Sequence, residues 1–139
     1  MAKLQSWLID KSAHARLPRS PDAELWLNRV QRGLVAIAPV TLLEIGYSAR
    51  NVTDWSAFQS TPPIGLMPVQ GLDAHAESRA IQVQGLLAQR GHHRAVSIPG
   101  LLIAATAESA GLTVLHVDRD FELIAEVTGQ PVERLAGDF

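Results

Sequence analysis

The sequence predicts an α/β fold in which a parallel sheet carries helices on both faces. Short apolar runs of strand length alternate with longer segments of helical periodicity along the chain. The runs over residues 7–9 and 34–38 are apolar throughout, which is typical of parallel strands that are buried on both faces. Alternating strands and helices connect through right-handed crossovers, which cover both faces of such a sheet. We therefore expect three layers, α/β/α, around a central, mainly parallel sheet of about four to five strands.

The first half of the chain supplies two strands, each followed by a helix. Residues 7–9 (Trp-Leu-Ile) form an apolar run that ends at Asp10. Ser20 is a predicted helix N-cap, and Pro21 and two acids follow it, as is typical of a first helical turn. The expected elements are a strand over residues 7–9, a helix from 20 that ends at Gly33, a strand over 34–38 and a helix over 41–50.

The second half continues the alternation. The expected elements are a short helix over residues 52–60, a third strand over 64–69, a helix over 73–90, a helix that opens at Pro99, a strand over 112–117, a helix over 121–128 and a candidate edge strand over 132–134. The helix over 73–90 is amphipathic, and Gly91 ends it. No repeat or linker divides the chain, so we expect a single domain over residues 1–139.

Composition excludes several classes of protein. The 139 residues are 47% hydrophobic and 19% charged, which is typical of a compact soluble protein. The absence of cysteine excludes thiol nucleophiles, zinc–thiolate sites and disulfide scaffolds. No apolar run approaches the ~20 residues that span a bilayer, and residues 1–10 lack a signal peptide's apolar stretch, so we expect a cytoplasmic protein without a membrane partner. The net charge of -2 means that a nucleic-acid role requires a local basic patch.

Acidic residues follow three of the predicted strands. Asp10 comes directly after the first strand, Asp118 and Asp120 follow the fourth, and Glu44 lies one helical turn beyond the second. Ligands of open parallel sheets bind outside the carboxyl ends of the strands, so these acids are expected at one edge. Converging carboxylates repel one another unless a cation is bound, which favours Mg²⁺ or Mn²⁺. Such ions can activate water and neutralise charge on a phosphodiester.

Each acid also has a purely structural alternative. Thr41 and Glu44 have the spacing of a capping box, in which the glutamate bonds the backbone at the helix N-terminus. Asp118 and Asp120 could form the acidic N-cap region of the last helix, and Asp10 could cap the turn that follows it. The residues alone leave these alternatives open.

Gly100 is unusual in the first turn of the helix that opens at Pro99. Glycine there costs about 1 kcal/mol relative to alanine. The partial positive charge of a helix N-terminus favours acids, so an aspartate would suit this position, which faces the same edge of the sheet.

Four segments carry a resemblance to a known family. They are residues 8–12 (LIDKS), 39–49 (PVTLLEIGYSA), 98–107 (IPGLLIAATA) and 116–121 (HVDRDF), and they span almost the whole chain. In this order they resemble the PIN-domain ribonucleases, most closely the VapC toxins of type II toxin–antitoxin pairs. The resemblance implies a PIN fold, RNA cleavage that depends on Mg²⁺ or Mn²⁺, a homodimer, and inhibition by a cognate VapB-type antitoxin.

The resemblance also implies roles for particular residues. Acidic positions of the family's metal site match Asp10, Glu44 and Asp118, with Asp120 as an additional or outer acid. Ser12 matches a position that helps to hold the site. Gly100 stands where the family has its remaining acid, so the resemblance implies a ribonuclease that has lost one metal ligand. The sequence leaves open whether this glycine is engineered, selected or natural.

Two other functions remain open on the sequence. A PIN-like module could bind RNA or an antitoxin without cleaving RNA. A small phosphatase-like α/β hydrolase could use Asp10 as its nucleophile, although such enzymes usually place a second acid two residues on, where this chain has Ser12.

A basic segment precedes the helix of Gly100. It contains Arg90, His92, His93 and Arg94. Adjacent histidines on a loop rarely point at one metal ion, and a solvated turn is the structural alternative. Because the segment lies just before the Gly100 helix, these side chains are expected to contact RNA phosphates near the acidic edge.

Overall fold

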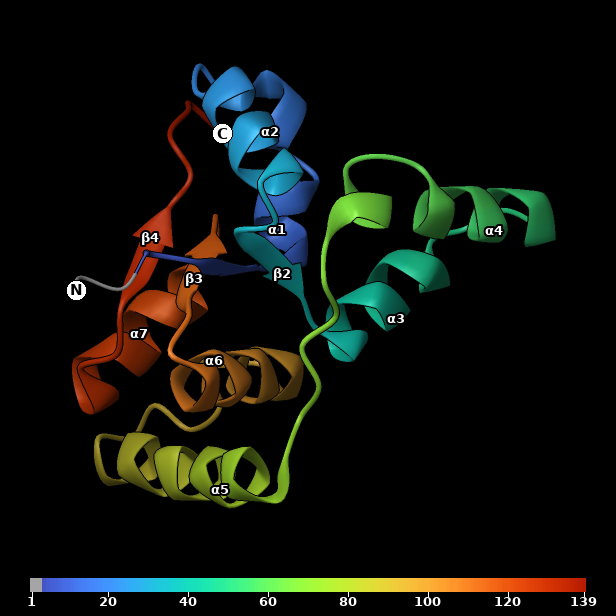
Figure 1. Ribbon diagram of the computed structural model, residues 1–139. Coiled ribbons are helices and arrows are strands. Elements are labelled where there is room, and N and C mark those ends of the chain that lie inside the picture. Colours follow the sequence, from blue (N-terminus) through green and yellow to red (C-terminus); the bar gives the residue numbers. More distant parts are fainter. Residues whose placement is uncertain (1–3) are drawn as a thin grey trace.

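The computed structural model describes residues 4–139 and contains four parallel strands in the order β2-β1-β3-β4 (Figure 1). The strands are β1 (Trp7–Ile9), β2 (Val35–Ile37), β3 (Thr113–His116) and β4 (Val132–Arg134). Leu8 is aligned with Ala36 on one side and Val114 on the other, so β1 and β3 form the centre of the sheet. Residues 1–3, which belong to the segment 1–10 considered above for a signal peptide, lie outside the described residues.

Helices cover both faces of this sheet, as expected. They are α1 (Lys11–His14), α2 (Ala23–Gln31), α3 (Pro39–Tyr47), α4 (Val52–Ser60), α5 (Ala74–Gln89), α6 (Ile98–Ala110) and α7 (Arg119–Thr128), with short 3₁₀ turns η1 (Leu17–Arg19) and η2 (Ile64–Leu66). In Figure 1, α1 and α2 lie above the sheet, α6 and α7 lie below it, and α5 lies outside α6. The predicted α/β/α layering is confirmed.

β1 and β2 are apolar throughout because each contributes to two cores. Leu8 and Val114 pack toward α5, α6 and α7 in one cluster. Trp7, Ile9 and Leu115 point to the opposite face, where they pack with residues of α1 and α2. Alternate side chains of a strand point to opposite faces, so a strand between two helical layers requires apolar residues at every position.

The predicted third strand over residues 64–69 is wrong. Residues Ile64–Leu66 form the 3₁₀ turn η2, and Val69 makes one isolated parallel bridge with Ile37. Ile64 and Met67 are both buried, and their spacing of three residues is the period of a 3₁₀ turn. Pro68 lacks an N–H and so cannot donate to a strand ladder. The apolar run therefore packs as a turn.

Helix boundaries differ from expectation at two functional segments. α3 begins at Pro39 instead of Thr41, because proline suits the first helical position. α7 begins at Arg119 instead of Phe121, and its N-cap is Asp118. The stops predicted at Gly33 and Gly91 are confirmed, since both glycines follow a helix with φ of 74°.

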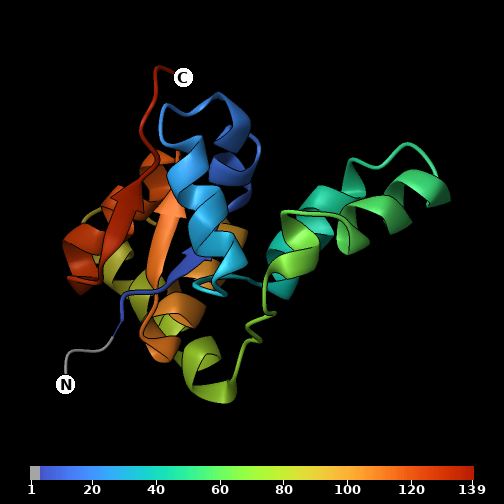
Figure 2. The same cartoon turned by 45° about the horizontal axis from the view of Figure 1, so that its top comes forward.

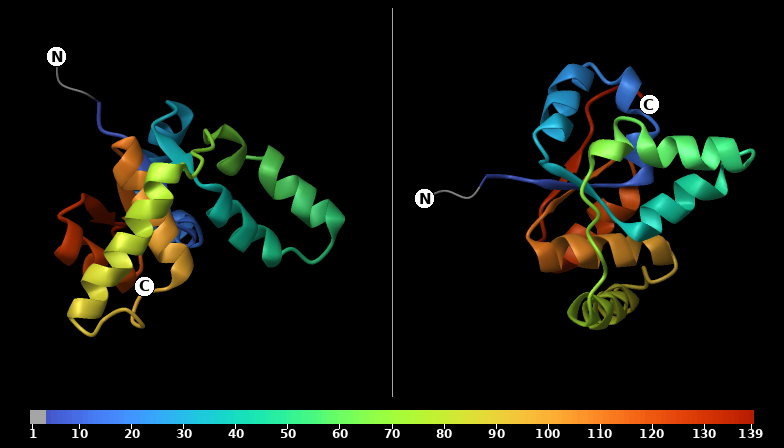
Figure 3. Two further views of the ribbon diagram at one scale, coloured as in Figure 1. Left: turned by 90° about the horizontal axis from the view of Figure 1, so that it is seen from below. Right: turned by 45° about the vertical axis from the view of Figure 1, so that its right-hand side comes forward.

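α3 and α4 project away from the sheet as a hairpin (Figures 2 and 3). This arrangement leaves large apolar side chains exposed, including Leu43 at 73% and Tyr47 at 93%. In the part of the chain that the structure describes, no helix combines the length and the hydropathy needed to cross a bilayer.

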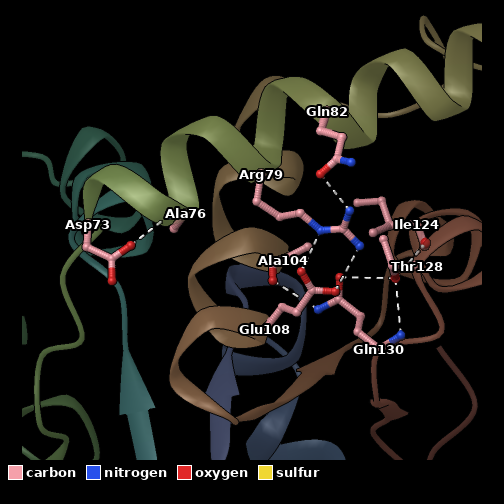
Figure 4. Close-up of polar contacts among 9 residues, drawn as sticks. All are labelled: Asp73, Ala76, Arg79, Gln82, Ala104, Glu108, Ile124, Thr128 and Gln130. Carbon is pink, nitrogen blue, oxygen red and sulfur yellow. Dashed lines mark hydrogen bonds and ion pairs between the residues drawn. The ribbon is translucent and has the colours of Figure 1, made fainter.

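Polar contacts fix α6 between α5 and α7 (Figure 4). Arg79 on α5 donates two hydrogen bonds to Glu108 on α6, from Nε to Oε1 at 2.7 Å and from Nη2 to Oε2 at 3.3 Å. Gln130, which follows α7, donates from Nε2 to the Ala104 carbonyl of α6 at 2.9 Å. The helix that carries Gly100 is therefore held on two sides.

Candidate functional site

Asp10 is a buried carboxylate at the end of β1. It is only 7% exposed, and its Oδ2 accepts hydrogen bonds from the Ser12 N–H at 3.0 Å and the Ser12 hydroxyl at 2.6 Å. The Ser12 hydroxyl oxygen accepts a hydrogen bond from the Val117 N–H at 2.9 Å. Ser12 therefore joins the carboxyl ends of β1 and β3 and fixes the Asp10 side chain. Asp10 also caps α1, as the structural alternative proposed.

Asp10 has no ion-pair partner among residues 4–139. A buried carboxylate without a cationic partner is unfavourable, because hydrogen bonds only partly replace the water that it loses. One carboxylate oxygen of Asp10 accepts the hydrogen bond that caps α1, and the other oxygen remains available to a ligand.

Glu44 lies on α3 and does not form the capping box that its spacing allows. Because α3 begins at Pro39 with Ala38 as N-cap, Thr41 is already inside the helix and cannot be the capping residue. The Glu44 carboxylate borders a surface hollow beside Lys11. It is thus free to take part in a site.

The electrostatic environment of Glu44 links it to two other acids. Partial burial raises the pKa of Glu44 above its usual value, and the negative charges of Asp10 and Asp118 raise it further, while Lys11 opposes them. The pKa of a carboxyl responds to charges a few ångströms away. Asp10 and Asp118, which come from two other segments, therefore lie near enough for their charges to act on Glu44, but among residues 4–139 no three acidic or histidine side chains have the spacing of a metal site.

Asp118 and Asp120 have different roles at the start of α7. Asp118 is the N-cap, and its Oδ1 accepts a hydrogen bond from the Asp120 N–H at 2.9 Å. The Asp118 N–H donates to His116 Nδ1 at 3.1 Å. Asp120 Oδ2 accepts a hydrogen bond from the Ser97 N–H at 2.9 Å, so Asp120 reaches across to the N-cap residue of α6. The cap alternative holds for Asp118, and Asp120 joins two helices.

His116 is buried beside these acids. Its pKa is lowered by burial, against the opposing charges of Glu122, Asp10 and Asp118. Because Nδ1 accepts the hydrogen bond from the Asp118 N–H, the neutral ring carries its proton on Nε2. A neutral His116 therefore fixes the backbone of Asp118.

Gly100 lies in the first turn of α6 and faces Asp120. A Cβ atom at this position would lie 3.6 Å from Asp120 Oδ2 and 3.0 Å from Ser97 Oγ, which caps the Gly100 N–H. The φ angle of Gly100 is not positive, so the backbone conformation does not require glycine. A longer side chain at residue 100 would therefore start next to the Asp120 carboxylate.

The basic segment before α6 is an exposed loop. Arg90, His92, His93 and Arg94 are all exposed, and within residues 4–139 their side chains make no hydrogen bond or ion pair. The turn is held by the backbone, with the His92 N–H bonded to the Leu87 carbonyl at 2.8 Å. The structure does not join these side chains to the acids by any direct contact.

A second hollow lies beside Asp118, with a volume of about 310 Å³. Arg16, Arg119 and Arg134 line it, and we call it the arginine hollow. The sequence patterns did not single out these arginines. Arg119 follows β3 and Arg134 ends β4, so the rule that placed the acids at the carboxyl ends of the strands could have found them.

Comparison with known proteins identifies close relatives. No protein-family model matches the chain. Ribonuclease VapC2 of Mycobacterium tuberculosis is 59% identical over 131 residues, which span 94% of this chain and 93% of that protein. Ribonuclease VapC51 of the same organism is 42% identical over 129 residues, with 91% and 90% covered.

Solved structures share the fold. The DNA-bound VapBC complex of Salmonella typhimurium matches with a TM-score of 0.75 and 19% identity, covering 94% of this chain and 98% of that one. VapBC-5 of Mycobacterium tuberculosis matches with a TM-score of 0.65 and 23% identity, covering 96% and 100%. These likenesses support the PIN fold, and the identities above establish the family. The chain belongs to the VapC family of PIN-domain ribonucleases.

Proposed function

We propose that this chain is the toxin of a toxin–antitoxin pair, with an acidic site for metal-dependent cleavage of RNA that lacks one carboxylate at Gly100. The observation that carries the proposal is the Ser12 hydroxyl, which bonds both Asp10 and the Val117 N–H and so places Asp10 beside the end of β3, where Asp118 follows. The charges of Asp10 and Asp118 also contribute to the raised pKa of Glu44. Ligands of open parallel sheets bind at the carboxyl ends of the strands. Hard divalent cations prefer carboxylate oxygens, which three separate segments supply at this edge. The relatives named as ribonucleases support RNA as the substrate.

The residues fit Mg²⁺ or Mn²⁺ as far as donor chemistry is concerned. Asp10, Glu44 and Asp118 would hold the ion, because each offers a carboxylate oxygen. Bound there, the ion would supply an activated water and neutralise charge on the phosphodiester. Within residues 4–139, no three His, Cys, Asp or Glu side chains already have the spacing of a metal site. The three carboxylates must approach one another to bind the ion, and their mutual repulsion opposes this approach.

The protein's own residues would orient the reacting groups. Ser12 holds one oxygen of Asp10 and leaves the other free. Asp118 is fixed by its capping bond to Asp120 and by the bond from its N–H to His116. Preorganised side chains lower the barrier because their orientation does not have to be reached during the reaction. These contacts make Ser12 and His116 positioning residues in the proposed site.

Gly100 accounts for the proposed loss of activity. Without a carboxylate at residue 100 the site has one fewer anionic ligand, so both metal affinity and cleavage rate fall. Removing one member of a group that acts as a unit commonly lowers the rate by orders of magnitude. Asp120 Oδ2 accepts the hydrogen bond from the Ser97 N–H, so at most its other oxygen is available as the additional, outer acid of the site.

Restoring the carboxylate tests the proposal. Gly100→Asp should cleave structured RNA in the presence of Mg²⁺ or Mn²⁺ at least tenfold faster than the parent chain, and should be toxic in cells without the antitoxin. Gly100→Asn is the matched control, because it has the same shape without the charge. The combined variant Gly100→Asp with Asp10→Asn should lose the gain. If Gly100→Asp cleaves RNA no faster than Gly100→Asn, the proposal is wrong.

The same variant separates the proposal from its main alternative, a PIN-like module that binds RNA or an antitoxin without cleavage. The absence of a side chain at Gly100 is the observation that favours this alternative. Binding of RNA by Gly100→Asp without cleavage would support the module. Cleavage would support the ribonuclease.

Partners follow from the relatives rather than from this chain alone. The structural neighbours are described as VapBC toxin–antitoxin complexes, so we propose a VapB-type antitoxin as the partner and a homodimer as the toxin unit. Exposed Leu43 and Tyr47 border the same hollow as Glu44, where a bound antitoxin would cover the acidic site. Light scattering of the chain alone and of its mixture with a candidate VapB-type antitoxin tests both assignments.

A further inference from the structure

The arginine hollow collects positive charge from three distant segments. Arg16 follows α1, Arg119 is the first residue of α7, and Arg134 is the last residue of β4. Asp118 and Glu122 border the same hollow, so three positive charges face two negative ones. The chain as a whole carries a net charge of -2, so this is a local reversal of sign. The hollow therefore favours an anionic ligand.

The three guanidinium groups are not neutralised by the neighbouring acids. Among residues 4–139, ion pairs join Arg50 to Asp54 and Arg79 to Glu108, and none involves the arginine hollow. Arg119 is exposed, and its side chain makes no hydrogen bond in this part of the chain. A guanidinium has five N–H donors in a fixed fork that matches a phosphate group. Donors of the arginine hollow therefore remain available to a ligand.

Backbone contacts nevertheless orient two of these arginines. Arg16 Nη1 donates to the Ser12 carbonyl at 3.0 Å. Arg134 Nη1 donates to the Leu135 and Gly137 carbonyls at 3.3 and 3.4 Å. Each contact uses a single nitrogen of the guanidinium, which leaves the others free.

The arginine hollow is connected to the acidic site through two residues. Asp118 borders the hollow and also acts on Glu44. Ser12 accepts a hydrogen bond from Arg16 with its carbonyl and donates one to Asp10 with its hydroxyl. An anion bound by Arg16 and Arg119 in the hollow would therefore lie next to the residues that hold Asp10 and Asp118.

We propose that the arginine hollow binds a phosphodiester of the RNA strand, and that this phosphodiester lies next to the one that is placed at the acidic site for cleavage. This inference rests on the proposed function, because it takes the acidic site as the place of cleavage. Arginine forks bind phosphate through paired charge-assisted hydrogen bonds. A contact to the strand on one side of the cleavage point fixes the register of the RNA, and it carries no information about base identity.

Binding of RNA by the chain as it exists tests the inference without any cleavage. The probe is a fluorescein-labelled single-stranded RNA, and its anisotropy is measured at increasing salt in the presence of EDTA. Each lost phosphate contact should reduce the slope of log affinity against log salt by about 0.7. Arg119→Gln and Arg134→Gln should each show this reduction and bind several-fold more weakly than the parent.

Arg32→Gln is the matched control. This substitution removes the same charge from an exposed residue at the end of α2, which does not line the arginine hollow. It should keep the slope of the parent chain. Thermal unfolding of each variant verifies that it is folded, and Arg119 offers the cleanest substitution since its side chain has no hydrogen bond to lose. Slopes for Arg119→Gln and Arg134→Gln equal to that of Arg32→Gln would overturn the inference.

Two further measurements distinguish an RNA phosphate from a free anion, and the phosphate site from the proposed cleavage. Inorganic phosphate added at constant ionic strength should not displace the RNA; strong displacement would assign the hollow to a free anion and overturn the assignment to an RNA strand. If Gly100→Asp fails to cleave while the arginine variants lose salt dependence, the proposed cleavage fails and the phosphate site stands. If Gly100→Asp cleaves RNA while the slopes stay unchanged, the proposed cleavage stands and the phosphate site fails.

Discussion

Asp120 Oδ2 lies 3.6 Å from the position that a Cβ atom would take at Gly100. The first turn of α6 therefore lies beside the first turn of α7. The hydrogen bond from the Ser97 N–H holds the Asp120 carboxylate in place. An aspartate at residue 100 would therefore add a second negative charge beside the first. Two carboxylates about 4 Å apart repel by about 1 kcal/mol in water and by more where water is excluded. A cation would remove that repulsion.

The stability of Gly100→Asp should consequently depend on divalent cations. In EDTA we expect Gly100→Asp to unfold at a lower temperature than Gly100→Asn, since the two differ only in charge. In millimolar Mg²⁺, Gly100→Asp should instead unfold at the higher temperature, because only this variant has the added carboxylate for the ion. A ligand that binds only the folded state stabilises it by about 2.7 kcal/mol at a hundred times its Kd. Differential scanning fluorimetry measures both temperatures. Equal responses of the two variants to Mg²⁺ would show that residue 100 does not contribute to a metal site.

Asp120 itself is expected to act mainly through its bond to Ser97. Asp120→Asn keeps an oxygen acceptor for the Ser97 N–H, so its free energy of unfolding should stay close to that of the parent. Asp120→Ala removes the acceptor and should cost about 1 kcal/mol in urea denaturation. If asparagine destabilises the protein as much as alanine does, the charge of Asp120 matters more than the hydrogen bond between the two helices.

Glu44 should make stability depend on pH in a defined direction. Its pKa is raised in the folded chain by burial and by Asp10 and Asp118, so the charged form is less favourable folded than unfolded. The penalty is present above the raised pKa and fades as the pH falls toward the ordinary value of the unfolded chain. Glu44→Gln should therefore stabilise the protein at neutral pH in the absence of divalent cations, and the gain should vanish at about pH 4. Urea denaturation at both pH values measures the effect.

A matched variant on the same projecting hairpin serves as the control for Glu44. Asp54 pairs with Arg50 on the surface, and hydrogen bonds from Arg50 lower its pKa, the opposite direction to Glu44. Asp54→Asn should therefore not stabilise the protein at neutral pH. A stabilisation by Asp54→Asn equal to that by Glu44→Gln would point to a general effect of removing negative charge.

The sequence was sufficient to predict the layers, and the gathering of the acids in one metal site stays a prediction. Continuous apolar runs such as residues 7–9 are diagnostic where a strand is buried on both faces. The rule that ligands bind at the carboxyl ends of parallel strands then placed Asp10 and Asp118 at one edge without coordinates. These predictions depend on the periodicity of short segments and on the parallel direction of the strands, which the alternation of strands and helices indicates.

The errors arose where short patterns fit two structures. Residues 64–69 are apolar enough for a strand, yet the flanking prolines and the burial of Ile64 and Met67 make them a 3₁₀ turn. Thr41 and Glu44 have capping-box spacing, and only the helix start at Pro39 decides against it. The strand-end rule could have placed Arg119 and Arg134 at the carboxyl edge, but no local pattern places Arg16 beside them, so the arginine hollow emerges only from the arrangement in space.

The ion pair between α5 and α6 should stabilise the layer that carries Gly100. Arg79 and Glu108 are each largely shielded, and the contact involves two hydrogen bonds. A double-mutant cycle with Arg79→Gln and Glu108→Gln should give a coupling energy of about 0.5 to 1 kcal/mol that decreases at high salt. The exposed pair of Arg50 and Asp54 provides the comparison, with a smaller coupling. Equal coupling in the two pairs would mean that shielding adds nothing to the α5–α6 contact.

Arg94 tests the proposed contact between the loop before α6 and RNA. Its side chain is exposed and makes no ion pair within residues 4–139, so Arg94→Ala should not alter folding. If the loop contacts phosphates, Arg94→Ala should weaken binding of single-stranded RNA and reduce the salt slope by about 0.7, while Arg32→Ala should not. His92→Ala and His93→Ala should weaken binding less, since neither substitution removes a guanidinium fork that matches phosphate. An unchanged salt response in Arg94→Ala would leave the loop as a solvated turn and confine phosphate recognition to the arginine hollow.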